Sequence, residues 1–80
     1  MNLQRYRNLS GKSNVYAFEV LTDAVIVQFN DKTVYTYQLQ KVGTSNLMEM
    51  KRLALAGVGL NSLINRTPAI RKGHSGKSIF

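Results

Sequence analysis

Few residues of this 80-residue chain are of the types that carry out covalent chemistry. It has one histidine, no cysteine and four acids, and the acids stand singly, so no acid-base pair or activated nucleophile stands out. A lone histidine with scattered carboxylates also gives no cluster of metal ligands. We therefore expect no catalytic residue, no metal site and no cofactor, and we predict that the protein is not an enzyme.

One segment near the C-terminus resembles a phosphate-binding loop. Residues 73–78 end in Gly-Lys-Ser, but Arg71 occupies the position at which the motif needs a glycine. Such a loop also follows a strand and opens a helix, and we expect neither here. We therefore predict no nucleotide hydrolysis, and we expect His74 to be a solvated side chain.

The charge of the chain is unevenly distributed. The net charge is +7, and between Val15 and Asn65 the cations and acids balance, so the whole excess lies in two flanks that contain no acid. Basic flanks favour a polyanion, because neutralised phosphates release condensed counterions. We predict mainly phosphate contacts, which carry little sequence selectivity. The candidate nucleic-acid-binding residues are Arg5, Arg7, Lys12, Arg66, Arg71, Lys72 and Lys77.

Length and composition indicate one small domain. Without cysteine there is no disulfide framework, which allows a reducing compartment. No window approaches eighteen consecutive apolar residues, and the polar N-terminal residues lack the apolar core of a secretory signal. We expect a soluble cytoplasmic protein without a membrane role.

Two apolar runs predict a β-hairpin. Residues 15–21 and 24–29 are rich in β-branched and aromatic side chains, and only Thr22 and Asp23 separate them. A two-residue loop would place Phe18 opposite Val27 and Tyr16 opposite Phe29. One face of the hairpin would then be wholly apolar.

A third strand is expected over residues 34–39, and the preceding loop decides which of its residues face the core. A two-residue loop would turn Val34 and Thr36 inward. A three-residue loop over residues 30–32 would place Tyr35 and Tyr37 on the core face instead. We favour the second register because it buries more apolar area, at about 25 cal/mol per Å², but both stay open at this stage.

A main helix should follow, and a short second helix after it. Asn46 and Glu49 have the spacing of a capping box, and Gly57 is a natural left-handed C-terminal residue. Residues 60–65 suggest one or two further helical turns. The apolar stripe of the main helix consists of Leu47, Met50, Leu53 and Ala54, widened by Met48 and Leu55.

Residues 13–66 resemble the KTSC domain, a small module found at the C-terminus of some lysyl-tRNA synthetases and as a free-standing bacterial protein. The resemblance rests on Tyr35-Thr36-Tyr37 after a strand ending in Phe29, and on Gly57-x-x-Leu60-Asn61-x-x-Ile64. The chain departs from the family pattern at Lys32, where glycine is usual, and at Leu60, where an aromatic residue is usual. The resemblance implies a strand meander with helices and suggests RNA binding, but it implies no established reaction.

The motif residues Tyr35, Tyr37 and Asn61 could serve the structure or a ligand. In the favoured register the tyrosines are mainly core residues, whereas exposed tyrosines could stack on bases. We expect Asn61 to cap a backbone group, with a ligand contact as the alternative.

These patterns predict an α+β fold: a three-stranded antiparallel meander packed on one main helix plus a short second helix. A single domain over residues 13–66 would lie between a flexible basic arm (1–12) and a flexible basic tail (67–80).

Our leading interpretation is a small RNA- or nucleic-acid-binding domain that acts through its basic arms. The alternative is a protein-interaction module, such as a homo-oligomer, an adaptor or an inhibitor, including one that comes from a mobile element. A single helix cannot cover both faces of the sheet, and an uncovered apolar face marks an interface. The candidate interface residues are Ala17, Leu21, Ile26 and Val34.

Overall fold

Each strand of the sheet pairs with the strand that precedes it in the chain. The computed structural model describes the backbone of residues 2–79 and the side chains of residues 2–73. Within this part, the sheet is antiparallel with the order β1-β2-β3-β4-β5. The strands are β1 (Gln4–Arg5), β2 (Val15–Val20), β3 (Ala24–Phe29), β4 (Thr33–Gln38) and β5 (His74–Ile79).

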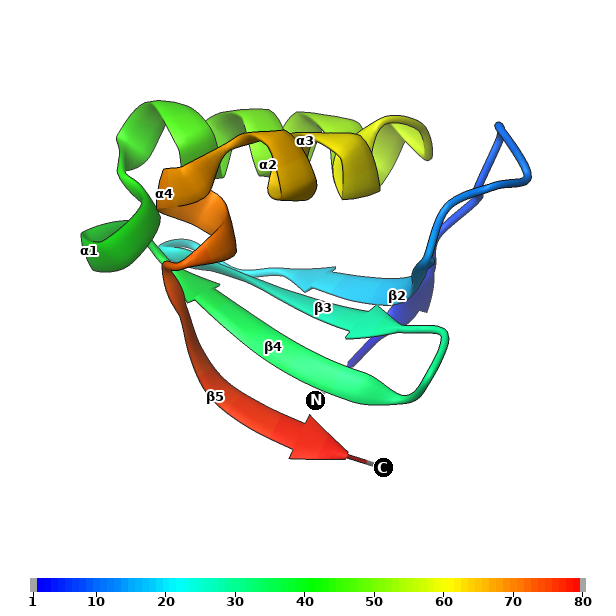
Figure 1. The fold of residues 1–80 in the computed structure, drawn as a ribbon, viewed down its shortest axis with the longest axis horizontal. Coiled ribbons are helices and arrows are strands. Elements are labelled where there is room, and N and C mark those ends of the chain that lie inside the picture. The colour runs from blue at the N-terminus through cyan, green and yellow to red at the C-terminus, as the bar shows by residue number, and fades with distance from the viewer. Residues whose placement is uncertain (1, 80) are drawn as a thin grey trace.

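The helices form a second layer on one side of the sheet (Figure 1). They are α1 (Leu39–Val42), α2 (Thr44–Ala56), α3 (Leu60–Arg66) and α4 (Pro68–Arg71). The predicted α+β class and antiparallel meander are therefore confirmed. The prediction of three strands and two helices was incomplete, because the arms add a strand at each edge and α1 and α4 add short turns.

The hairpin of β2 and β3 has the predicted register over most of its length. Phe18 pairs with Val27, and the ladder shifts at a β-bulge between Val15 and Ala17, so Val15 instead of Tyr16 lies opposite Phe29. The extra residue reverses the alternation of side chains locally. Tyr16 is therefore 41% exposed and Val15 only 1%, which corrects the prediction that Tyr16 belongs to the core face.

The loop between β3 and β4 has three residues, and the register that buries the tyrosines is confirmed. Tyr35 pairs with Val27 and Tyr37 with Val25, and Tyr37 is only 2% exposed. The backbone N–H of Lys32 donates to the Phe29 carbonyl at 2.9 Å. Lys32 itself has φ = 72°, the left-handed conformation that this loop type requires at its third residue.

The main helix begins one residue after Gly43, and the predicted capping box is wrong. Asn46 lies inside α2, where its side-chain Nδ2 donates to the Val42 carbonyl at 2.7 Å. Glu49 is instead held by the guanidinium of Arg52 at 2.6 Å. Because α1 brings the Val42 carbonyl within reach, Asn46 bonds backward to that carbonyl and does not cap its own helix.

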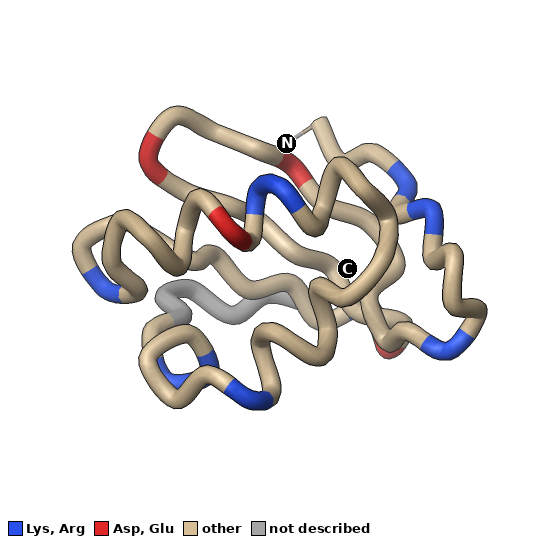
Figure 2. The backbone as a smooth tube through the Cα atoms, turned by 90° about the horizontal axis from the view of Figure 1, so that it is seen from above, with Lys and Arg blue, Asp and Glu red and all other residues tan. Residues whose placement is uncertain are grey.

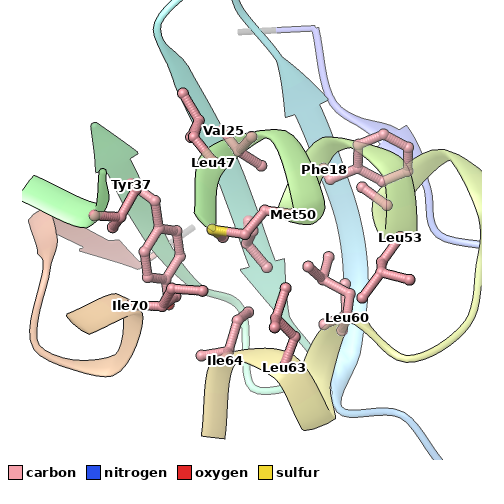
Figure 3. Packing of buried hydrophobic residues seen from close by; sticks show 14 of the residues in the cluster. Phe18, Val25, Tyr37, Leu47, Met50, Leu53, Leu60, Leu63, Ile64 and Ile70 are labelled. Atoms are coloured by element: carbon pink, nitrogen blue, oxygen red, sulfur yellow. The ribbon is translucent and has the colours of Figure 1, made fainter. Parts of the chain in front are cut away.

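The core lies between the sheet and the helix layer (Figure 3). Met50 of α2 points into its middle, with Val25 of the sheet on one side and Leu63 and Ile64 of α3 on the other. The predicted stripe of α2 is confirmed, since Leu47, Met50, Leu53 and Ala54 are all buried. Its predicted widening is wrong: Met48 is 65% and Leu55 55% exposed.

The N-terminal arm is packed onto the body, contrary to the expectation that it is loose. Tyr6 is 3% exposed, and its ring meets Phe18 edge to face at 6.4 Å between centroids. Farther along, the backbone N–H of Leu9 donates to the Gly57 carbonyl at 2.8 Å. A single buried aromatic residue produces no periodic pattern, so the sequence does not predict that Tyr6 packs on the body.

The residues assigned to the mobile tail also take regular structure. Pro68 is the first residue of α4, and Ile70 in the same helix is fully buried. The backbone of residues 74–79 runs as β5 alongside β4. Gly, Ser and Lys have low strand propensity, so the sequence of this stretch did not predict a strand. The strand forms because its backbone pairs with that of β4.

Candidate functional site

A cleft of about 480 Å³ opens between the sheet and α3. The sheet side is lined by three aromatic residues of β3 and β4, and the opposite side mainly by polar residues. We call it the amide cleft. Its aromatic residues are Phe29, Tyr35 and Tyr37, and its other residues are Asn14, Asp31, Thr33, Asn61, Ile64, Asn65 and Arg71.

The aromatic wall of the amide cleft is a chain of three rings. Tyr35 meets Phe29 at 5.7 Å with an interplanar angle of 71°, and it meets Tyr37 at 6.3 Å. Burial raises the pKa of the Tyr37 hydroxyl well above its usual value, and the neighbouring Tyr35 raises it further. Tyr37 is thus a neutral phenol of the core, while Tyr35 and Phe29 are half-buried and form the accessible part of the wall.

The opposite wall presents side-chain amides from α3. Asn61 and Asn65 are four residues apart and therefore lie on the same face of the helix. Within the described part of the chain, neither side chain has a hydrogen-bond partner. The expectation that Asn61 caps a backbone group is wrong for the described residues: Gly59 is the N-cap of α3, and no side chain caps that helix.

Buried neighbours hold these polar residues in place. Leu60 is fully buried beside Asn61, and its backbone N–H donates to the Tyr6 hydroxyl at 3.2 Å. Ile70, also fully buried, anchors α4 next to the exposed Arg71. The helix side of the amide cleft is therefore held by the core itself.

A smaller cleft of about 250 Å³ adjoins the first, and we call it the serine cleft. Lys12 contributes its cation, and Asn61 borders both clefts. Lys12 from the N-terminal flank and Arg71 from the C-terminal flank thus lie on either side of Asn61. The other residues of the serine cleft are Ser10, Ser13, Gly59 and Ser62.

Among the described side chains, the other four predicted cations line neither cleft. The guanidinium of Arg5 lies 4.2 Å from the centre of the Tyr16 ring, Arg66 ends α3, and Lys72 lines a separate hollow beside Lys41. Arg7 packs its side-chain stem near Gly57. The side chain of Lys77 lies outside the described residues, as does that of His74.

Along the described backbone, Lys and Arg positions lie at several separate places, near both ends of the view and on a helix in its middle (Figure 2). Acidic positions lie among them. Of the six predicted contact residues whose side chains the structure describes, Lys12 and Arg71 line the two adjoining clefts.

Three motif residues come together in the amide cleft, namely Tyr35, Tyr37 and Asn61. Sequence reasoning missed Asn14 and Asn65, which lie there as well. The helical spacing from Asn61 could have pointed to Asn65, whereas no pattern marked Asn14. The latter is brought in by a long-range backbone contact, in which the N–H of Asn30 donates to the Asn14 carbonyl at 2.9 Å.

The other face of the sheet offers less apolar surface than expected. Ala17 and Val34 are each only 3% exposed within the single chain. Ile26 is half-buried and lies between Glu19 and Thr36 on the neighbouring strands. Leu21, at 38% exposed, is the most accessible of the four predicted interface residues.

Among the described residues, no three histidine, cysteine or acidic side chains lie close enough to hold a metal ion together. No helix in the same part of the chain has the length and apolar character needed to cross a bilayer.

Comparison with known proteins assigns this chain to no family. No family model matches it, and neither a curated protein nor a solved structure does.

Proposed function

We propose that this protein is a small, non-catalytic domain that binds single-stranded RNA through phosphate contacts of its flanking cations. The observation that carries the proposal is that Asn61 borders both clefts. Cations from opposite ends of the chain, Lys12 and Arg71, therefore lie on either side of one polar surface.

Charge and exposure support a polyanion as the ligand. The chain carries a net charge of +7, and the side chains of Lys12 and Arg71 are exposed. Neither cation forms an ion pair in the described part of the chain, so both remain available for phosphate.

The resemblance to the KTSC domain supports the same proposal. Its motif residues Tyr35, Tyr37 and Asn61 are distant in sequence but line one cleft, as residues that serve a common ligand would. On this proposal the chain is a KTSC-like domain that works in the cytoplasm. The alternative of a protein-interaction module has less support, because the chain itself already covers Ala17 and Val34.

Fluorescence anisotropy with a short single-stranded RNA over a salt series tests the proposal. The variant is Lys12→Gln/Arg71→Gln, and its matched control is Lys51→Gln/Arg52→Gln, which removes the same charge from α2. We expect the first variant to lower the salt slope by about 1.4, because each phosphate contact to a single strand contributes about 0.7. The control should keep the wild-type slope.

Three results would contradict the proposal. Absence of salt-dependent binding would overturn RNA binding itself. Equal losses in the two double variants would show that only net charge matters. Tighter binding of single-stranded DNA of the same sequence would replace RNA by DNA as the ligand.

A further inference from the structure

We propose that the amide cleft holds one unpaired nucleobase of the bound strand. The base would pack against Tyr35, and its hydrogen-bonding edge would meet Asn61 and Asn65. This inference rests on the proposed function and adds a second kind of contact to it. Phosphate contacts form whether or not the strand carries a base, whereas this site requires one.

The dimensions of the amide cleft suit a ligand of this size. Its volume of about 480 Å³ lies within the range of roughly 300–1,000 Å³ that is typical of small-molecule sites. Ile64 and the aromatic rings supply apolar lining, and the side-chain amides together with Asp31, Thr33 and Arg71 supply polar groups. A flat heterocycle with a polar edge matches this division.

Tyr35 is a supported stacking surface. Its ring is flanked by Phe29 at 5.7 Å and by Tyr37 at 6.3 Å, so little freedom is lost when a base packs on it. Tyr37 is only 2% exposed and remains part of the core. Half-buried Tyr35 therefore offers a ring that is both fixed and accessible.

The two asparagines suit the edge of a base better than they suit a purely anionic or cationic ligand. Each side-chain amide offers donors and an acceptor together, and the edge of a nucleobase also mixes the two. Neither amide is occupied by another described residue. Recognition of unpaired bases by stacking combined with edge hydrogen bonds is the general mode for single-stranded RNA.

Cations in the two clefts favour a nucleotide over an uncharged flat ligand. Arg71 lines the amide cleft itself, and Lys12 lies beyond Asn61 in the serine cleft. A strand with its base in the amide cleft could place one neighbouring phosphate near each cation. The positions of the two cations thus agree with a nucleotide as the ligand.

Nuclear magnetic resonance on the full chain labelled with nitrogen-15 tests the inference without any substitution. The probes are AMP, GMP, CMP and UMP, each titrated separately, with ribose 5-phosphate as the base-free control. We expect at least one nucleotide to shift the side-chain amide signals of Asn61 and Asn65 in a saturable way, and ribose 5-phosphate to leave them unmoved. If no nucleotide shifts them, or if ribose 5-phosphate shifts them equally, the inference is wrong.

A binding comparison then separates the base contact from the phosphate contacts. Asn61→Ala/Asn65→Ala is compared with Gln38→Ala, an exposed amide outside both clefts, on single-stranded RNA and on an abasic strand of equal length. We expect the double variant to bind RNA about tenfold more weakly, because it loses the hydrogen bonds to the base edge while the stack on Tyr35 remains. Its affinity for the abasic strand and its salt slope should not change.

The outcomes distinguish the two proposals. If wild-type protein binds RNA and the abasic strand equally, with a steep salt slope, phosphate binding stands and the base site is overturned. If nucleotides shift the two amides while binding of the RNA strand has no salt slope, the base site stands and binding through the arms is overturned. A folded double variant that keeps full RNA affinity also contradicts the base site.

Discussion

The backbone N–H of Leu60 donates a hydrogen bond of 3.2 Å to the hydroxyl of Tyr6, across 54 positions of the chain. This contact ties the N-terminal flank to the first turn of α3, and both partners are buried. It therefore links the stability of the fold to the position of the neighbouring Asn61.

Replacing Tyr6 by phenylalanine should test that link. Tyr6→Phe leaves the ring in place but removes the acceptor of a buried N–H, which costs about 1–3 kcal/mol. The free energy of unfolding, measured by urea denaturation, should fall by that amount. Tyr16→Phe is the control, because Tyr16 is 41% exposed; an equal loss in both variants would contradict a specific role for the Tyr6 hydroxyl.

Lys32→Gly should make the protein more stable. Lys32 has φ = 72°, and an L-residue with a Cβ in this left-handed conformation is disfavoured by about 1–2 kcal/mol. Part of this gain is offset by the greater freedom of glycine in the unfolded chain, so we expect a net increase of about 1 kcal/mol. The control Lys32→Ala removes the same charge but keeps the Cβ, and an equal gain there would assign the effect to charge instead.

Gly57→Ala should destabilise the protein more than Gly11→Ala does. Both glycines have positive φ, but a Cβ at Gly57 would lie 2.5 Å from the Cβ of Arg7, whereas one at Gly11 would meet nothing within 4 Å. The strain of about 1–2 kcal/mol from the left-handed conformation is common to both. The difference between their thermal unfolding midpoints therefore reports the close contact of the N-terminal flank with α2, and equal midpoints would contradict that contact.

Stability should fall at alkaline pH because of Tyr37. Its folded-state pKa is raised by burial first and by Tyr35 second, so the folded state favours the protonated phenol. This contribution is complete below the unfolded-state pKa of about 10 and is lost as pH rises toward the folded-state value, at about 1.4 kcal/mol per pH unit. Tyr37→Phe should reduce this slope in urea titrations above pH 10, and Tyr16→Phe should keep it.

The central hairpins could be predicted because independent patterns agreed. The alternation in β2 and that in β3 both specified the pairing of Phe18 with Val27. Burial of aromatic area likewise selected the correct inward face of β4. The bulge at Tyr16 was not predicted. A bulge leaves the types of residue in the strand unchanged and alters only the face of the sheet on which a side chain lies.

The packing of the flanks could not be predicted because it depends on distant partners. Tyr6 docks against Phe18 and Leu60, and β5 depends on the exposed edge of β4. Neither contact produces a periodic pattern of apolar residues in the nearby sequence. The same holds for the amide cleft: the motif pointed to Tyr35 and Asn61, but only the folded chain brings Asn14 and Arg71 beside them.

The sequential strand order also has a consequence for folding kinetics. In the order β1-β2-β3-β4-β5, very short loops connect the strands of the central hairpins. All four helices lie between β4 and β5 in the sequence, so pairing these two strands closes a long loop. Loop-closure entropy grows with the length of the loop, and contacts between distant residues slow folding. We therefore expect the hairpins around Val27 to form early and the two edge strands to join late. Val27→Ala should slow refolding in stopped-flow experiments, whereas Tyr6→Phe should mainly speed unfolding.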